Sequence, residues 1–181
     1  MIKVYIQKWS KKDVPWQHIL ADVLKRDYHI EECPEIVCDD MGKPYLKDFP
    51  LYFNVSHSGE YLAIAVSKKP VGVDIQETKV IKDGMYRKVV QPGEAMLIGK
   101  ERQRDFLRLW ALKESFVKAE GCGLRIPMKD YYFELENDRY FVNYNGQRMH
   151  WIFNIEETLV EEHFISVCGM EDSVQWILNQ E

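Results

Sequence analysis

Two carboxylates and a lysine are the side chains of this 181-residue chain whose types and spacing best suit chemistry. Asp74 lies in the apolar run Val71 to Ile75, and Glu114 and Lys118 are four residues apart in a stretch with helical spacing, so they share one helix face. At about 4 Å, the carboxylates of Asp74 and Glu114 would repel by roughly 4 kcal/mol at an effective dielectric near 20. A divalent cation would relieve this repulsion, and oxygen ligands suit Mg²⁺ better than zinc.

Both features also have simpler structural explanations. Asp74 can cap the turn after its strand, and Glu114 with Lys118 can form a solvated ion pair worth a few tenths of a kcal/mol. The helix face that carries this pair is among the more apolar ones, with Trp110 and Val117 beside it. An ion pair without a ligand is unfavourable there, so we interpret Asp74 and Glu114 as a metal site with Lys118 beside it.

The run from Asn54 to Ser58 places two serines and a histidine together after a predicted strand. A nucleophile with its base is one interpretation, but neighbouring residues seldom face each other, and the run contains no G-x-S-x-G elbow. Hydroxyls, an imidazole and backbone N–H groups also form phosphate cradles. We favour a cradle for Ser56 and His57.

The elements that position these residues follow from hydrophobic periodicity. Helices are predicted from about 13 to 29, from residue 92 and from about 104 to 120, and strands over 2–7, 51–55, 61–67, 71–75, 131–136, 140–144, 151–155, 164–167 and 174–178. The runs 61–67 and 71–75 predict an antiparallel hairpin, and the last five runs predict further antiparallel strands. This order predicts an α+β fold with two similar halves joined near residues 76–90.

Charge and composition narrow the class of ligand. The net charge of −5 argues against a protein that coats nucleic acid or an anionic membrane. Residues 71–130 carry 12 basic and 9 acidic side chains, whereas residues 131–181 carry 2 and 10, so an anionic ligand is expected in the middle segment. The absence of a membrane-spanning run and of a C-x-x-C pair among the four cysteines predicts a cytoplasmic protein with reduced thiols.

Four motifs, in order along the chain, carry a resemblance to a known family. They are Gly42-Lys43-Pro44, Asn54-Val55-Ser56-His57-Ser58, Gly72-Val73-Asp74-Ile75-Gln76 and Trp110-x-x-Lys113-Glu114-Ser115-Phe116-x-Lys118-x-x-Gly121-x-Gly123-Leu124. Together they resemble the Sfp-type 4'-phosphopantetheinyl transferases. The resemblance implies Mg²⁺-dependent transfer of phosphopantetheine from coenzyme A to a serine of an apo acyl or peptidyl carrier protein, with release of adenosine 3',5'-bisphosphate. It also implies pseudo-twofold symmetry, for which a monomer suffices.

The resemblance assigns roles to the matched residues. Coenzyme A would be bound by Lys43, Pro44, Ser56, His57, Lys113 and Lys118; Mg²⁺ would be held by Asp74, Gln76 and Glu114; catalysis would involve Glu94, Glu114 and Lys118. Residues 1–78 would bind the adenine and phosphates, and residues 79–181 would supply the metal site, catalysis and carrier docking. The acidic helix of the carrier is expected near the basic residues of 102–129, which include Arg125 and Lys129.

Two departures and two alternatives accompany the resemblance. The family often has a second acid where this chain has Gln76, so Mg²⁺ would be held with one less negative charge. Gln17 and His18 stand where the family has basic residues for the 3'-phosphate of coenzyme A. The residues alone also fit a metal-dependent phosphohydrolase or nuclease, or a carrier-binding relative that has lost its chemistry.

Overall fold

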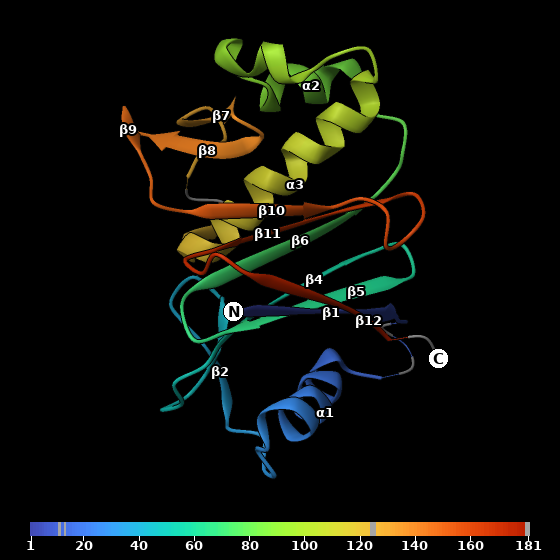
Figure 1. Cartoon of the computed structure of the whole chain (residues 1–181), viewed down its shortest axis with the longest axis vertical. Coiled ribbons are helices and arrows are strands. Elements are labelled where there is room, and N and C mark those ends of the chain that lie inside the picture. Colours follow the sequence, from blue (N-terminus) through green and yellow to red (C-terminus); the bar gives the residue numbers. More distant parts are fainter. Residues whose placement is uncertain (11, 13, 124–125, 180–181) are drawn as a thin grey trace.

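Two sheets packed face to face form the centre of the molecule, and one long helix covers the outer face of each (Figure 1). This computed structural model describes residues 1–10, 12, 14–123 and 126–179. The first sheet has the order β12-β1-β5-β4 and the second the order β10-β11-β6. Their strands are β1 (Ile2–Lys8), β4 (Tyr52–Ser58), β5 (Tyr61–Ser67), β12 (Val174–Asn179), β6 (Val71–Glu77), β10 (Ile152–Glu156) and β11 (His163–Gly169).

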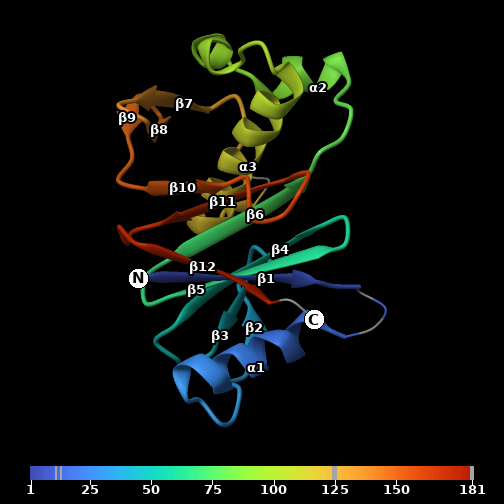
Figure 2. The same cartoon turned by 45° about the vertical axis from the view of Figure 1, so that its right-hand side comes forward.

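Smaller elements surround these layers. The helical ones are α1 (Trp16–Tyr28) below the first sheet, α2 (Asp83–Val89) and the 3₁₀ helix η1 (Pro92–Leu97) at the far end, and α3 (Arg102–Glu120) on the second sheet (Figure 2). Two minor sheets consist of β2 (Ile36–Cys38) with β3 (Pro44–Leu46), and of β7 (Tyr131–Glu136), β8 (Arg139–Tyr144) and β9 (Gln147–Arg148). In the described part of the chain, no helix combines the length and the apolar run needed to cross a membrane.

Alternation along β1 explains how the layers pack. Val4 and Ile6 point into the core between the two sheets, whereas Tyr5 points to the opposite face and packs with Leu20 and Leu24 of α1. All five side chains are buried. Burying each large apolar side chain stabilises the fold by about 1.5–3 kcal/mol, so these two interfaces hold the first sheet between its neighbours.

Helix α3 lies unusually close to the second sheet because β6 has a glycine at the contact. A Cβ at Gly72 would overlap the Ser115 carbonyl and the Ala119 amide. Beside it, the hydroxyls of Ser115 and Ser166 share a buried hydrogen bond of 2.9 Å between α3 and β11. Close approach here fixes the height of α3 over β6, on which Asp74 lies.

Polar side chains of β4 join the two sheets by accepting backbone hydrogen bonds that a neighbouring strand would otherwise accept. Three polar side chains at alternate positions accept hydrogen bonds from backbone N–H groups of β6. The pairs are Asn54 Oδ1 with Val73 N–H (2.8 Å), Ser56 Oγ with Ile75 N–H (3.3 Å) and Ser58 Oγ with Glu77 N–H (3.0 Å). Because backbone N–H groups buried between sheets need partners, this ladder explains the N-x-S-x-S pattern structurally.

The α+β class is confirmed, with a helix on each of two sheets, but two pairing predictions are wrong. The expected hairpin of 61–67 with 71–75 does not form, because β5 pairs with β1 and β4 whereas β6 pairs with β11. The last strand, β12, runs parallel to β1. Residues 68–70 therefore carry the chain from one sheet to the other, and the two sequence halves exchange strands. Position 13, the expected start of α1, lies outside the described residues.

Candidate active site

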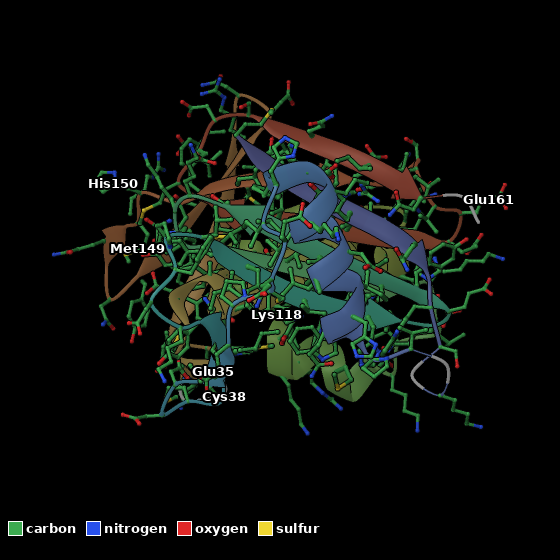
Figure 3. The ribbon with its side chains drawn as sticks, turned by 90° about the horizontal axis from the view of Figure 1, so that it is seen from below. Glu35, Cys38, Lys118, Met149, His150 and Glu161 are labelled. Carbon is green, nitrogen blue, oxygen red and sulfur yellow. The ribbon has the colours of Figure 1, made fainter. Side chains whose placement is uncertain are left out.

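Asp74 lies at the centre of a polar cluster between β4, β6 and α3. Its Oδ1 accepts hydrogen bonds from Ser56 Oγ at 2.9 Å and from Lys118 Nζ at 2.6 Å. Lys118 Nζ also donates to Ser56 Oγ at 2.8 Å. Asp74 is buried and Lys118 is partly exposed, so the ammonium group lies between a buried carboxylate and solvent. Lys118 lies toward the middle of the molecule in Figure 3, whereas Cys38 and His150 lie at its margin.

Gln76 and Glu114 complete the cluster. Gln76 Nε2 donates to Asp74 Oδ2 at 2.7 Å, so both carboxylate oxygens of Asp74 are engaged. Burial first, and then the negative charge of Asp74, raise the pKa of Glu114, and only Lys118 opposes this. Lys118 thus pairs with Asp74, not with Glu114 in the solvated i, i+4 pair considered from the sequence. Two carboxylates therefore lie within electrostatic range with one ammonium near them.

The residues of this cluster fit a hard divalent cation. They offer carboxylate oxygens from Asp74 and Glu114 and an amide oxygen from Gln76, and Mg²⁺ prefers such oxygen ligands while keeping several waters. Burial, and then the negative charge of Asp74, raise the pKa of Glu114, and a cation bound here would relieve the repulsion between the two carboxylates. Within the described residues no group of three His, Cys, Asp or Glu side chains has metal-binding geometry. Such a group is not required here, because the third oxygen donor is a glutamine.

A pocket of about 250 Å³ opens beside Lys118. Lys43, Pro44 and Val55 line it, together with the glycines after α3. Lys43 Nζ donates to the Ala119 carbonyl at 3.0 Å, near the C-terminal end of α3, and burial lowers its pKa. The structure thus brings the expected ligand residues Lys43, Pro44 and Lys118 to one cavity.

A second pocket of about 250 Å³ lies on the Glu114 side of the cluster. Its wall is mostly apolar and includes Met85 of α2, Phe106 and Trp110 of α3, with Gln76 at its edge. Sequence reasoning missed this pocket because α2 was not predicted: its seven residues are too few to show periodicity. Asp74, Glu114 and Lys118 therefore lie between two cavities, one next to Lys118 and one next to Glu114.

Glu94 and Lys113 form a fully buried ion pair, both side chains having 0% exposure and a 2.8 Å Nζ–Oε1 distance. Lys113 Nζ also donates to the carbonyls of Met128 and Tyr131, and Glu94 accepts the N–H groups of Gln91 and Phe133. Burial lowers the pKa of Lys113, and Glu94 opposes this. The expected catalytic role of Glu94 and substrate contact of Lys113 do not fit this arrangement. Burial inside a satisfied network makes the pair a structural tie between η1, α3 and β7.

Ser56 and His57 lie on opposite faces of β4 and do not form one cradle. Ser56 is buried against Asp74, whereas the exposed His57 ring packs against Trp9 with centroids 5.2 Å apart. Successive strand residues point to opposite faces, and this alternation separates the two side chains. Ser56 therefore orients Asp74 and Lys118, and only His57 is exposed.

Among the basic residues expected to meet a carrier, Lys129 lines a groove of about 850 Å³ together with Arg87, Lys88 and Met128. Leu124 and Arg125 lie outside the described residues. Met128 connects this groove to the buried Glu94–Lys113 pair, because its carbonyl accepts a hydrogen bond from Lys113 Nζ at 3.3 Å. The groove is therefore tied structurally to the residue that precedes Glu114.

Comparisons with known proteins agree with this site. Residues 70–168, which include Asp74, Glu114 and Lys118, match the family model of the 4'-phosphopantetheinyl transferase superfamily. The chain is 32% identical to the 4'-phosphopantetheinyl transferase Sfp of Bacillus subtilis over 126 residues, 66% of this chain and 56% of that protein. It is 31% identical to the 4'-phosphopantetheinyl transferase gsp of Aneurinibacillus migulanus over 182 aligned positions, 95% of this chain and 76% of that protein.

One solved structure is also similar in part. The holo-[acyl-carrier-protein] synthase AcpS of Thermotoga maritima superposes with a TM-score of 0.49 at 20% identity, over 57% of this chain and 64% of that one. The chain spans little more than half the length of Sfp and about three quarters of gsp. The matched family model covers more than half of the chain and contains the polar cluster described above. The chain belongs to the 4'-phosphopantetheinyl transferase superfamily.

Proposed function

We propose that this chain transfers 4'-phosphopantetheine from coenzyme A to a serine of an apo acyl or peptidyl carrier protein and releases adenosine 3',5'-bisphosphate. The observation that carries the proposal is the cluster of Asp74, Glu114 and Lys118 between two cavities. Coenzyme A has a nucleotide and a largely uncharged arm on either side of its pyrophosphate, and the two cavities suit these two parts. The family membership supports the same reaction.

Each residue of the cluster has a role in this proposal. Lys118 neutralises negative charge on the phosphate that is transferred or released, which is the main way that proteins promote phosphoryl-type transfer. Ser56 and Gln76 hold the Asp74 carboxylate by hydrogen bonds of 2.9 and 2.7 Å. Lys43 and Pro44 line the nucleotide cavity. His57 contacts a phosphate from the opposite face of β4.

The proposal includes Mg²⁺ as the metal that Asp74, Glu114 and Gln76 would hold. When bound, it would supply positive charge to the pyrophosphate and help orient the reacting groups. The amide of Gln76 gives this site one negative charge less than three carboxylates would. We also propose that the protein is a cytoplasmic monomer; its four free cysteines are consistent with a reducing compartment. We propose that neither a nucleic acid nor a membrane is among its partners.

Product analysis separates this function from hydrolysis. The protein is incubated with coenzyme A and Mg²⁺, with and without an apo carrier protein, and the nucleotides are resolved by chromatography. A transferase releases adenosine 3',5'-bisphosphate only when the apo carrier is present, because the serine is the acceptor. Release without carrier would indicate a phosphohydrolase, and no release with any of several carriers would favour a relative without this chemistry.

A further inference from the structure

The segment between β1 and α1 places an aromatic ring against His57. Trp9 directly follows β1, and its ring lies 5.2 Å from the His57 ring, centroid to centroid, with the planes tilted by 52°. Both rings lie on the face of the first sheet that α1 covers, since Trp9 packs on the same apolar cluster as Phe53 and Leu62. This contact lies on the face of β4 opposite to Asp74.

Trp9 is held in place by two hydrogen bonds that do not involve His57. Its backbone N–H donates to the Glu60 carbonyl at 2.8 Å, in the turn that joins β4 to β5. Its indole Nε1 donates to the Val14 carbonyl at 2.7 Å, near the start of α1. The ring therefore has a fixed position before any ligand binds, as a support for a binding residue should.

His57 is the exposed residue of the N-x-S-x-S motif. Asn54, Ser56 and Ser58 direct their polar groups to the backbone of β6. These bonds clamp the β4 backbone on both sides of His57. Glu60, whose carbonyl accepts the Trp9 N–H, has its carboxylate 3.5 Å from Lys8 Nζ, so its negative charge is partly balanced at this surface.

We propose that Trp9 is a positioning residue that holds the His57 imidazole toward a phosphate of the nucleotide donor. The proposal rests on the proposed function, because it takes the nucleotide part of coenzyme A as the ligand. A free imidazole loses rotational freedom when it hydrogen-bonds to an anion. Packing against Trp9 restricts the ring in advance, so binding loses less entropy. The phosphate at His57 is distinct from the one at Lys118, because the two side chains lie at opposite faces of β4.

A double-mutant cycle with adenosine 3',5'-bisphosphate as the probe tests this role. Binding is measured by isothermal titration calorimetry for the wild type, Trp9→Leu, His57→Ala and the double variant. We expect Trp9→Leu to weaken binding about 2- to 10-fold, the usual effect of an aromatic contact. In the His57→Ala background the same change should have almost no effect. Trp9→Phe keeps a ring but not the indole N–H and should restore most of the affinity.

Two further readouts separate positioning from general stability. The loss of the indole ring current should move the NMR resonances of the His57 ring in Trp9→Leu, while circular dichroism should show that the variant is fully folded at the assay temperature. In the transfer assay, KM for coenzyme A should rise with kcat unchanged. Trp16→Leu is the matched control, because the Trp16 ring pairs with Phe53 at 5.8 Å between ring centroids, whereas the His57 ring pairs with Trp9.

The outcomes distinguish the two levels of the proposal. If the wild type binds the bisphosphate and the Trp9 and His57 effects simply add, or if Trp9→Leu has no effect, Trp9 does not act through His57. If the wild type transfers phosphopantetheine but His57→Ala binds the probe normally, the phosphate contact at His57 is wrong. If the wild type neither binds the bisphosphate nor transfers the group, the proposed function fails and this role fails with it.

Discussion

At the scale of single residues, the charged carboxylate of Glu114 lowers the stability of the folded state. Burial and the neighbouring Asp74 raise its pKa above its ordinary value, so the folded chain holds the Glu114 proton more tightly than the unfolded chain does. The contribution of this bound proton to the free energy of unfolding is fully present below the ordinary pKa of a glutamate. It is lost as the pH rises through the raised pKa that Glu114 has in the folded state. Active sites often contain such groups, because function requires a charge that folding does not favour.

We therefore predict that Glu114→Gln abolishes transfer but raises the melting temperature at pH 7. The neutral amide removes the partly buried charge, so the gain in melting temperature should shrink toward pH 4, where Glu114 of the wild type is itself protonated. Calorimetric melting at both pH values measures the effect. Glu32→Gln is the control, because Glu32 is exposed and its replacement should change little. An equal gain at both pH values would contradict the electrostatic explanation.

The buried pair of Lys113 and Glu94 gives the second prediction at this scale. Lys113→Met leaves the Glu94 carboxylate without its cation at 0% exposure, so the free energy of unfolding should fall by about 3–5 kcal/mol. Urea denaturation measures the loss. Glu94→Gln with Lys113→Met should recover much of it, because no buried charge is left unpaired. A stable single variant would show that the pair does not tie η1, α3 and β7 together.

At the scale of elements, close packing of α3 on β6 sets the distance between Lys118 and Asp74. Gly72 permits this approach, since any Cβ there would overlap the Ser115 carbonyl. The β4 ladder fixes β6 from its other side through Asn54, Ser56 and Ser58. The geometry of the Asp74 cluster is thus a consequence of backbone contacts on both faces of one strand.

Gly72→Ala should consequently lower the free energy of unfolding by about 3 kcal/mol or more, because the backbone of α3 must move. It should also slow transfer in the molecules that remain folded, since Lys118 moves with the helix. Chemical denaturation and a transfer assay measure the two effects. Gly84→Ala is the matched control: a Cβ there meets nothing within 4 Å, and the change should stabilise α2 by up to about 1 kcal/mol. A harmless Gly72→Ala would contradict the close packing.

At the scale of the whole molecule, local patterns predicted which segments are strands but not which strands pair. Residues 61–67 and 71–75 both form strands, yet a three-residue connection carries the chain between sheets, and β6 pairs with the distant β11. Which strand pairs with β6 depends on the burial of both of its faces, and the hydrophobic periodicity of the sequence carries no information about this pairing. Similarly, spacing identified Asp74, Glu114 and Lys118, whereas the burial of Glu94 and Lys113 depends on β7, far along the chain.

The charge distribution gives a prediction at the same scale. Lys129 shares a basic groove with Arg87 and Lys88, whereas the acidic excess lies in the C-terminal strands. If an acidic carrier docks at this groove, Lys129→Glu should slow transfer severalfold at low salt and much less at high salt, where exposed charges are screened. Lys68→Glu, in the turn at the opposite end of β6 from α2, should leave the rate unchanged. Equal slowing at both salt concentrations would contradict docking at the groove.

We propose above all that the cluster around Asp74 transfers phosphopantetheine to a carrier serine. The most direct measurement is the intact mass of an apo carrier after incubation with coenzyme A, Mg²⁺ and either the wild-type protein or Asp74→Asn. We predict a gain of one phosphopantetheine with the wild type, no gain with Asp74→Asn, and none on a carrier whose acceptor serine is replaced by alanine. A full mass gain with Asp74→Asn, or none with the wild type across several carriers, would show that this cluster does not transfer the group.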